Sequence, residues 1–119
     1  MNKYHNKKVV IDGIEFDSKK EGNYYIKLKT MRKAGLVDAI ELQPEFILIP
    51  SFKKNGKTYR KTTYKADFKY IDKISNKIIV VDVKGFKTKE YMLKKKLFEY
   101  QYQELEIKEI WKQWQDYTG

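Results

Sequence analysis

The sequence predicts a mixed α/β fold (α+β class), with one central mixed β-sheet flanked by helices. Three observations support this. Residues 19–34 have the polar–apolar pattern of a helix, which Gly35 ends. Residues 78–84 are β-branched and mostly apolar on both faces, as in a central strand. The predicted order of hairpin, helix, several strands, helix and strand gives helices packed on a mixed sheet. A chain of 119 residues is long enough for a single domain, 1–119, with one core.

The N-terminal elements have clear boundaries. Apolar runs at 9–11 and 14–16 flank Asp12-Gly13, a two-residue signal for a tight hairpin turn. Asp17 and Ser18 then offer caps for the helix at 19–34. We therefore expect a hairpin followed directly by a helix.

The middle of the chain predicts strands. Residues 46–49 form one, and Asn55-Gly56 marks a hairpin between Phe52 and Tyr59. Apolar side chains then alternate with polar ones over residues 64–70. We expect one continuous strand there, with one buried face. That face carries Tyr64, Ala66, Phe68 and Tyr70.

The last elements follow turn signals at 72–77. The central strand at 78–84 ends at Gly85, and Thr88 can cap a helix that runs to about residue 102. Residues 105–110 can return as a further strand. The helix face predicted to be buried carries Leu93, Leu97 and Tyr100.

Composition excludes several classes of enzyme. The chain has no Cys and a single His, His5, so thiolate zinc sites, disulfides and Cys nucleophiles cannot form. One histidine also excludes serine hydrolases, HExxH metalloproteases and nucleases that hold a metal through several histidines. A general base in this chain would therefore have to be a group other than histidine.

The charge predicts a polyanionic partner. Lys and Arg number 26 against 16 Asp and Glu, a formal net charge of +10, and nucleic acid is the simplest ligand for it. Only Arg32 and Arg60 are arginines, which favours phosphate contacts over base readout, although an AT-rich genome also raises the share of lysine. No apolar run approaches the ~18 residues of a spanning helix and no signal peptide is visible, so we expect no membrane partner and a cytoplasmic protein.

Polar residues at the end of the central strand need an explanation. Asp82 and Lys84 share one face of this strand. Burying a carboxylate and an ammonium group costs free energy, so structure alone is a weak reason for their presence. Asp67 belongs to the neighbouring predicted strand. If the strands pair, Asp67, Asp82 and the backbone carbonyl of Val83 could bind one cation through the oxygen ligands that Mg²⁺ prefers. The alternative is a buried ion-pair network.

Glu21 has two interpretations. Ser18-x-x-Glu21 is a capping box, in which Glu21 bonds back to the Ser18 amide. Helical phase also puts Glu21 on the core-facing stripe, from which its carboxylate could reach Asp67 and Asp82. That stripe includes Tyr24, Tyr25, Leu28 and Met31.

Glu21, then Asp67, then Asp82-Val83-Lys84 resemble the three motifs of the PD-(D/E)XK nuclease superfamily. A longer similarity, over about residues 4–110, is to a family of small phage proteins placed in that superfamily. It rests on the stretches Tyr4-His5-Asn6-Lys7-Lys8, Phe16-Asp17-Ser18-Lys19-Lys20-Glu21, Leu42-Gln43-Pro44 and Asp82-Val83-Lys84-Gly85-Phe86-Lys87-Thr88-Lys89. Ala66 replaces the Pro of the superfamily name, Asp82 stands in place of Glu, and 14 residues separate Asp67 from Asp82, all within the variation of the superfamily.

The resemblance implies a restriction-endonuclease-like core and a Mg²⁺-dependent DNA endonuclease, with Mn²⁺ as a substitute. The catalytic residues would be Glu21, Asp67, Asp82 and Lys84, and the metal ligands Glu21, Asp67, Asp82 and Val83. Lys84 would orient or help deprotonate the attacking water, and Glu21 would hold a water or a second metal. The resemblance further implies a phage-encoded, junction-resolvase-like enzyme. It would act on branched DNA in recombination, repair or replication, in the cytoplasm of a bacterial host.

Lysines near these motifs are candidates for DNA contact. Nine basic residues between 53 and 77 predict a basic face, opposed only by Asp67 and Asp72. The residues that we expect to bind DNA are Lys19, Lys20, Lys61, Lys65, Lys87, Lys89, Lys94 and Lys95. The alternative function is a non-catalytic, basic nucleic-acid-binding module.

The C-terminal residues Ile110, Trp111, Trp114 and Tyr117 recur at the spacing of one helix face. They could pack on the sheet of their own domain. They could equally form the interface of a homodimer, which would suit a symmetric DNA substrate.

Overall fold

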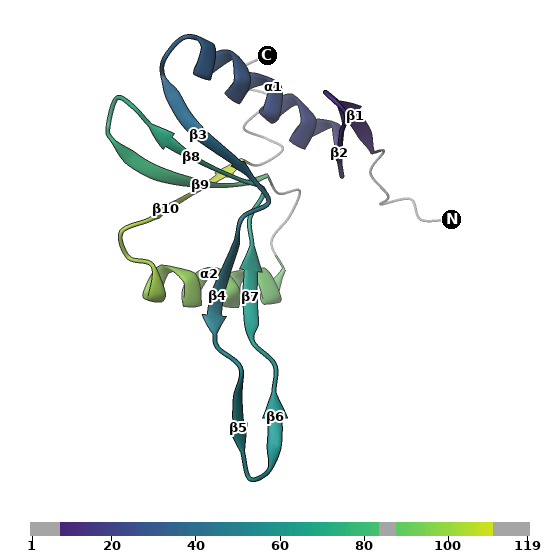
Figure 1. The fold of residues 1–119 in the computed structure, drawn as a ribbon, viewed down its shortest axis with the longest axis vertical. Coiled ribbons are helices and arrows are strands. Elements are labelled where there is room, and N and C mark those ends of the chain that lie inside the picture. Colours follow the sequence, from purple (N-terminus) through teal and green to yellow (C-terminus); the bar gives the residue numbers. More distant parts are fainter. Residues whose placement is uncertain (1–7, 84–87, 111–119) are drawn as a thin grey trace.

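The Asp12-Gly13 pair forms the predicted tight turn in a computed structural model, which describes residues 8–83 and 88–110 (Figure 1). Both residues have positive φ, 55° and 77°, and join the antiparallel strands β1 (Val9–Ile11) and β2 (Ile14–Phe16). Helix α1 (Lys19–Lys33) follows, capped by Ser18, and ends just before Gly35, whose φ is 79°. These predictions are confirmed.

Four strands form the main sheet, in the order β10-β9-β8-β3. They are β3 (Val37–Leu42), β8 (Phe68–Asp72), β9 (Lys77–Val83) and β10 (Glu106–Ile110). β10 runs parallel to β9, because helix α2 (Lys89–Gln101) carries the chain back between them, and the other pairs are antiparallel. The fold is therefore a mixed α+β fold, as the sequence predicted.

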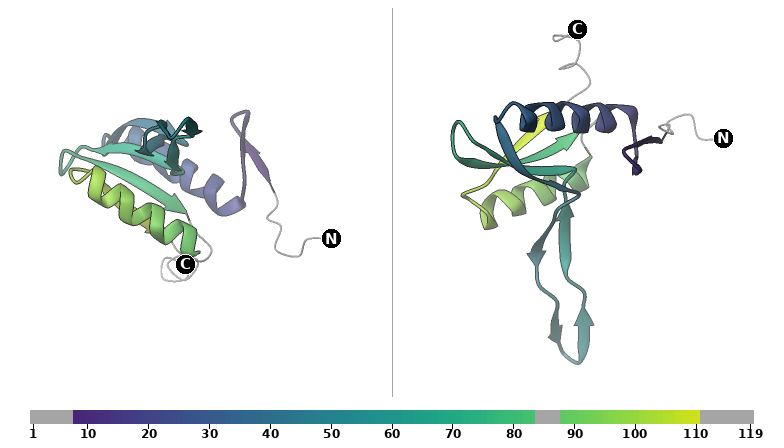
Figure 2. Two further views of the ribbon diagram at one scale, coloured as in Figure 1. Left: turned by 90° about the horizontal axis from the view of Figure 1, so that it is seen from below. Right: turned by 45° about the horizontal axis from the view of Figure 1, so that its top comes forward.

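The remaining strands leave this sheet as a long hairpin. β4 (Glu45–Ile49) pairs with β7 (Thr62–Lys65), and β5 (Phe52–Lys54) pairs with β6 (Lys57–Tyr59), all antiparallel. α2 packs across β4 and β7, whereas β5 and β6 extend beyond it (Figures 1 and 2). The predicted hairpin around Asn55-Gly56 is thus confirmed.

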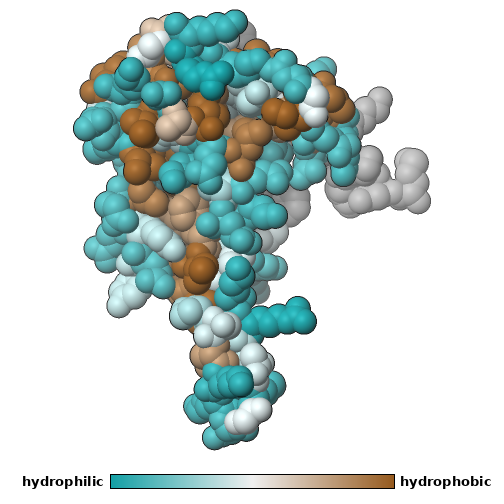
Figure 3. All heavy atoms as spheres, viewed as in Figure 1, coloured by the Kyte–Doolittle hydropathy of each residue, from teal (hydrophilic) through white to brown (hydrophobic). Residues whose placement is uncertain are grey.

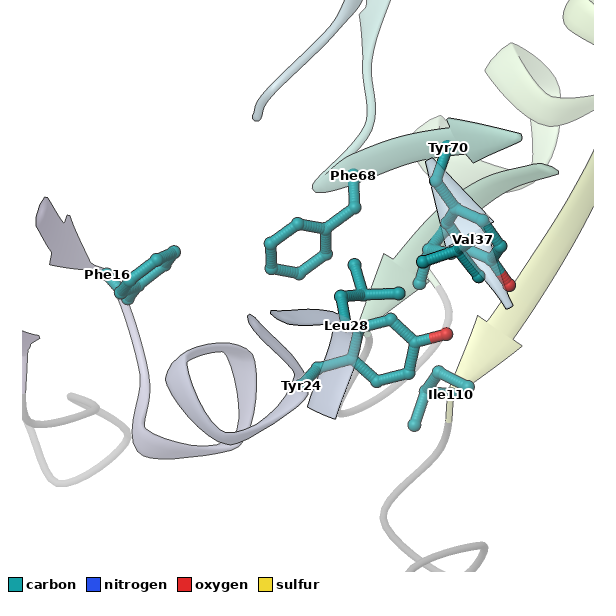
Figure 4. Packing of buried hydrophobic residues seen from close by; sticks show 8 residues of the cluster. Phe16, Tyr24, Leu28, Val37, Phe68, Tyr70 and Ile110 are labelled. Atoms are coloured by element: carbon teal, nitrogen blue, oxygen red, sulfur yellow. The ribbon is translucent and has the colours of Figure 1, made fainter. Parts of the chain in front are cut away.

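Two hydrophobic clusters lie on opposite sides of the main sheet. The first joins α1 to the sheet and includes Val81, together with Leu28 and Phe68, which Figure 4 shows. The second joins α2 to β4, β7 and the other face of β9, and includes Phe98 and Val80. Because side chains alternate along a strand, β9 contributes to both clusters.

The strand predicted over residues 64–70 is wrong in one respect. It is interrupted at Ala66-Asp67, with Tyr64 and Ala66 in the second cluster but Phe68 and Tyr70 in the first. Before this point the chain pairs with β4, and after it the chain pairs with β9, so its buried side changes from one core to the other. The Gln43-Pro44 segment makes the same change beside it. Two backbone hydrogen bonds join the segments: Gln43 N–H to the Asp67 carbonyl (2.9 Å) and Ala66 N–H to the Pro44 carbonyl (3.0 Å).

Strand β3 was not predicted. Its alternation is broken by a register shift between Asp38 and Glu41, where Ala39 has a φ of 53°. A positive φ is uncommon for alanine, so the residue types gave no warning of this irregularity.

The buried face predicted for α2 is only partly correct. Leu93 and Tyr100 are 57% and 76% exposed, and Leu97 is half-buried. The helix instead buries Tyr91 and Phe98, because the opposing strands present aromatic rings such as Phe46, which lies 4.9 Å from the Phe98 ring between centroids.

Several sequence predictions concern residues outside the described ranges: His5, Lys84, Lys87, Trp111, Trp114 and Tyr117. Ile110 is described, and it is buried in the first cluster. Neither α1 nor α2 is long and apolar enough to cross a membrane.

Candidate functional site

Asp67 lies where the long hairpin separates from the main sheet. Its N–H donates to the Val81 carbonyl (2.9 Å), and its carboxylate Oδ2 accepts the Val83 N–H at 2.6 Å. The side chain thus takes the place of a strand neighbour at the end of β9. Since its backbone carbonyl also accepts a hydrogen bond, from Gln43, the position of Asp67 is fixed at three points.

Asp82 is buried in β9, on the side of the second cluster, with only 1% of its surface exposed. The hydroxyl of Tyr64, itself buried, donates a hydrogen bond to its Oδ2. Burial raises the pKa of Tyr64, and the nearby negative charges of Asp82 and, more weakly, Asp67 raise it further. The Tyr64 hydroxyl thus holds the Asp82 carboxylate in this position.

Glu21 lies in the first turn of α1. The Ser18 Oγ accepts the Glu21 N–H at 3.1 Å, which confirms the cap. The Glu21 side chain is nevertheless buried, with 5% exposed, and lines a cavity of about 160 Å³ together with Asp67. The other residues lining this cavity are Ile14, Glu15, Phe16, Leu42 and Gln43. Capping and a position beside Asp67 are thus compatible.

These groups are oxygen donors, and oxygen is the ligand that Mg²⁺ prefers. Within residues 8–83 and 88–110, however, no three Asp, Glu or His side chains form a group that could hold a metal ion. A metal bound at this point would rest on Asp67, Asp82 and the Val83 carbonyl, while Glu21 lines the cavity beside Asp67. The chemistry of these oxygen atoms suits Mg²⁺.

A second cavity borders Tyr64. It has a volume of about 240 Å³ and is lined by Lys65 and Lys94, with Thr88 at the N-terminus of α2. Tyr64, Glu90 and Tyr91 complete its lining. The positive charges and the helix N-terminus favour an anion in this cavity, although Glu90 forms an ion pair with Lys94 at 3.2 Å.

Sequence analysis missed the tyrosines around Asp82. Tyr64 was assigned to the core, and no local signal shows that its hydroxyl meets a residue 18 positions away. Tyr91 packs on Tyr64, with ring centroids 6.3 Å apart, and donates to Glu109 at 2.5 Å. Lys95, predicted to bind DNA, forms an ion pair with Glu109 at 3.4 Å.

The other predicted DNA-binding lysines are dispersed. Lys19, Lys61 and Lys89 are exposed, and Lys20 is half-buried. The basic residues from 53 to 77 do not form one face, because Lys69 and Lys77 belong to the main sheet, where they pair with Glu41 and Glu106, both at 3.6 Å. Those from 53 to 61 lie on the long hairpin.

The model of a family described as "Protein of unknown function (DUF1064)" matches residues 1–118. No curated protein and no solved structure matches the chain.

Proposed function

The chain belongs to the DUF1064 family, and we propose that it is a Mg²⁺-dependent DNA endonuclease that hydrolyses phosphodiester bonds. The observation that carries the proposal is the pair Asp67 and Asp82 at the end of β9. Asp82 is almost fully buried, and Asp67 is held against the Val83 N–H. Burial of the Asp82 carboxylate is a cost to the fold that a metal-binding role would account for.

The residues of the chain would divide the reaction between them. Asp67 and Asp82 would bind Mg²⁺, which supplies Lewis acidity at the scissile phosphate. Tyr64 would hold the Asp82 carboxylate in one orientation through its hydroxyl. Lys65 and Lys94 would attract the phosphate and offset its growing negative charge in the transition state. The proposed roles of Lys84, at the attacking water, and of Glu21, at a water or second metal, come from the motif.

The substrate that we propose is branched DNA. Few arginines leave little capacity to read bases, whereas many lysines can bind the phosphates where duplexes meet. A homodimer would supply two sites for a symmetric junction. The residues proposed for its interface, Trp111 and Trp114, follow β10.

The decisive experiment incubates labelled junction, flap and linear DNA with the protein in Mg²⁺, Mn²⁺, Ca²⁺ or EDTA. We expect cleavage in Mg²⁺ and Mn²⁺, binding without cleavage in Ca²⁺, and no cleavage in EDTA. Asp82→Asn should abolish cleavage but keep the fold, since an amide oxygen can still accept the Tyr64 hydroxyl. Asp38→Asn, the same change at an exposed residue, is the matched control.

Each outcome has a clear reading. Cleavage by Asp82→Asn at the wild-type rate, or full activity in EDTA, would exclude the proposed mechanism. DNA binding without cleavage under any condition would leave the non-catalytic binding module. Equal cleavage of linear and junction DNA at ~150 mM salt would remove the branched preference alone.

A further inference from the structure

The end of the long hairpin, residues 50–61, stands apart from both hydrophobic clusters and is here termed the arm. All of its residues are exposed. The molecule has a radius of gyration of 16.3 Å, against about 13.5 Å for a compact domain of this length, and the arm lies along its longest axis (Figure 1). The hairpin is formed by local signals alone, since Asn55 and Gly56 have the positive φ values, 53° and 76°, of a tight turn.

The arm is positively charged throughout. It contains five basic residues and no acidic one, equal to half of the formal net charge of +10: Lys53, Lys54, Lys57, Arg60 and Lys61. Lys54 and Lys57 lie directly opposite each other across the two strands, a like-charge arrangement that destabilises a hairpin. Hydrophilic side chains cover most of its end (Figure 3). The arm is thus built at a cost to its own stability, which a polyanion would relieve.

One face of the arm combines these charges with aromatic rings. Phe52 and Tyr59 face each other across the strands, with centroids 4.8 Å apart and an angle of 10° between the rings. The alternation of side chains puts Lys54 and Lys57 on this same face. The Lys57 ammonium lies 4.9 Å from the centre of the Tyr59 ring. Both rings remain about 40% exposed, at 45% and 39%, so no core explains them.

We propose that the arm is a second DNA-binding element, which enters the major groove of a duplex beside the site. This rests on the proposed function for the identity of the ligand. A two-stranded β-ribbon fits the major groove of B-form DNA, where the lysines would meet phosphates on either side. The deep, narrow major groove of duplex RNA would not admit it.

β7 connects the arm to the site. Tyr59 lies five positions before Tyr64, a length of about 17 Å in an extended strand. The rise of B-form DNA is about 3.4 Å per base pair. Tyr59 would therefore reach the duplex about five base-pair steps from the bond at Asp82, and DNA held by the arm would be directed towards the site.

The test uses the full chain with three arm lysines removed, Lys53→Ala/Lys54→Ala/Lys57→Ala. The matched control, Arg32→Ala/Lys33→Ala/Lys73→Ala, removes the same charge from exposed residues elsewhere. Binding of a fluorescent DNA duplex of about 20 base pairs is measured by fluorescence anisotropy in EDTA, at salt concentrations from about 50 to 200 mM. The same measurement is made with duplex RNA of the same sequence.

At about 100 mM salt we expect the arm variant to bind DNA at least about tenfold more weakly than the wild type. The slope of log affinity against log salt concentration should fall in magnitude by about 2 to 3. The control should change both much less. Equal binding by the two variants, or no DNA binding by the wild type, would overturn the proposal. Equally tight binding of duplex RNA would overturn insertion into the groove.

Because binding is measured without catalysis, the two proposals can fail separately. A wild type that cleaves DNA, with an arm variant that binds normally, would exclude the arm and leave the endonuclease. An arm variant that loses binding, with a wild type that never cleaves, would leave the arm and exclude the endonuclease.

Discussion

The hydroxyl of Tyr64 should stabilise the fold and the site together. Tyr64→Phe removes this hydroxyl and keeps the ring, which packs against Phe46, Tyr91 and Phe98. The packing of the second cluster is therefore preserved. The change removes the hydrogen bond that Tyr64 donates to Asp82 and the weaker contact of the same hydroxyl with Tyr91.

The expected loss follows from the nature of that bond. A buried hydrogen bond to a charged group contributes about 1.5 to 3 kcal/mol, whereas one between neutral groups contributes about 1 kcal/mol. For a domain of this size each kcal/mol corresponds to roughly 3 to 6 °C in Tm. Tyr64→Phe should thus lower Tm by about 5 to 18 °C. Tyr24→Phe is the control, because Tyr24 is also buried but hydrogen-bonds to the neutral Tyr70.

Both variants are compared with the wild type by urea denaturation and thermal unfolding, followed by circular dichroism. We also expect Tyr64→Phe to need more Mg²⁺ for half-maximal cleavage, since Asp82 loses a group that orients it, whereas Tyr24→Phe should not. If Tyr64→Phe lost no more free energy of unfolding than Tyr24→Phe, the charged character of the bond would be refuted. An unchanged Mg²⁺ requirement would refute the positioning role.

Two further predictions concern titration and the α1 cap. Burial raises the pKa of Tyr24, Tyr64 and Tyr91 above the ordinary 10.0, so above that pH only the unfolded chain releases these protons. The urea midpoint should therefore be steady up to about pH 9 and fall above about pH 10, and a midpoint unchanged at about pH 11 would contradict this. Glu21→Gln should abolish cleavage in the DNA assay, whereas Ser18→Ala should cost only about 1 kcal/mol of stability. Normal cleavage by Glu21→Gln would leave capping as its only role.

Local signals predicted much of the fold. Asp12-Gly13 and Asn55-Gly56 fixed two hairpins because few residue pairs accept their backbone angles. The run that became β9 was recognised because a strand in the middle of a sheet is apolar on both faces. The polar residue at its end, Asp82, was recognised as a candidate site for the same reason, and its burial confirms that it needs an explanation.

Features that depend on distant contacts were not predicted. The change of core at Ala66-Asp67 leaves the alternation of side chains intact, so only the partner strands reveal it. The exposure of Leu93 depends on where the aromatic rings of β4 and β7 meet α2. The role of the Tyr64 hydroxyl depends on its hydrogen bond to Asp82, which is distant in the sequence.

The alternation of Val80 and Val81 along β9 also bears on how the protein folds. Each valine belongs to a different core, so neither core is complete without this strand. The two cores should form and unfold as one cooperative unit, although they lie on opposite sides of the sheet. Asp67 lies where the chain passes from one core to the other, and Asp82 lies in β9, the strand that both cores share. The geometry of the site is therefore tied to the global folding equilibrium.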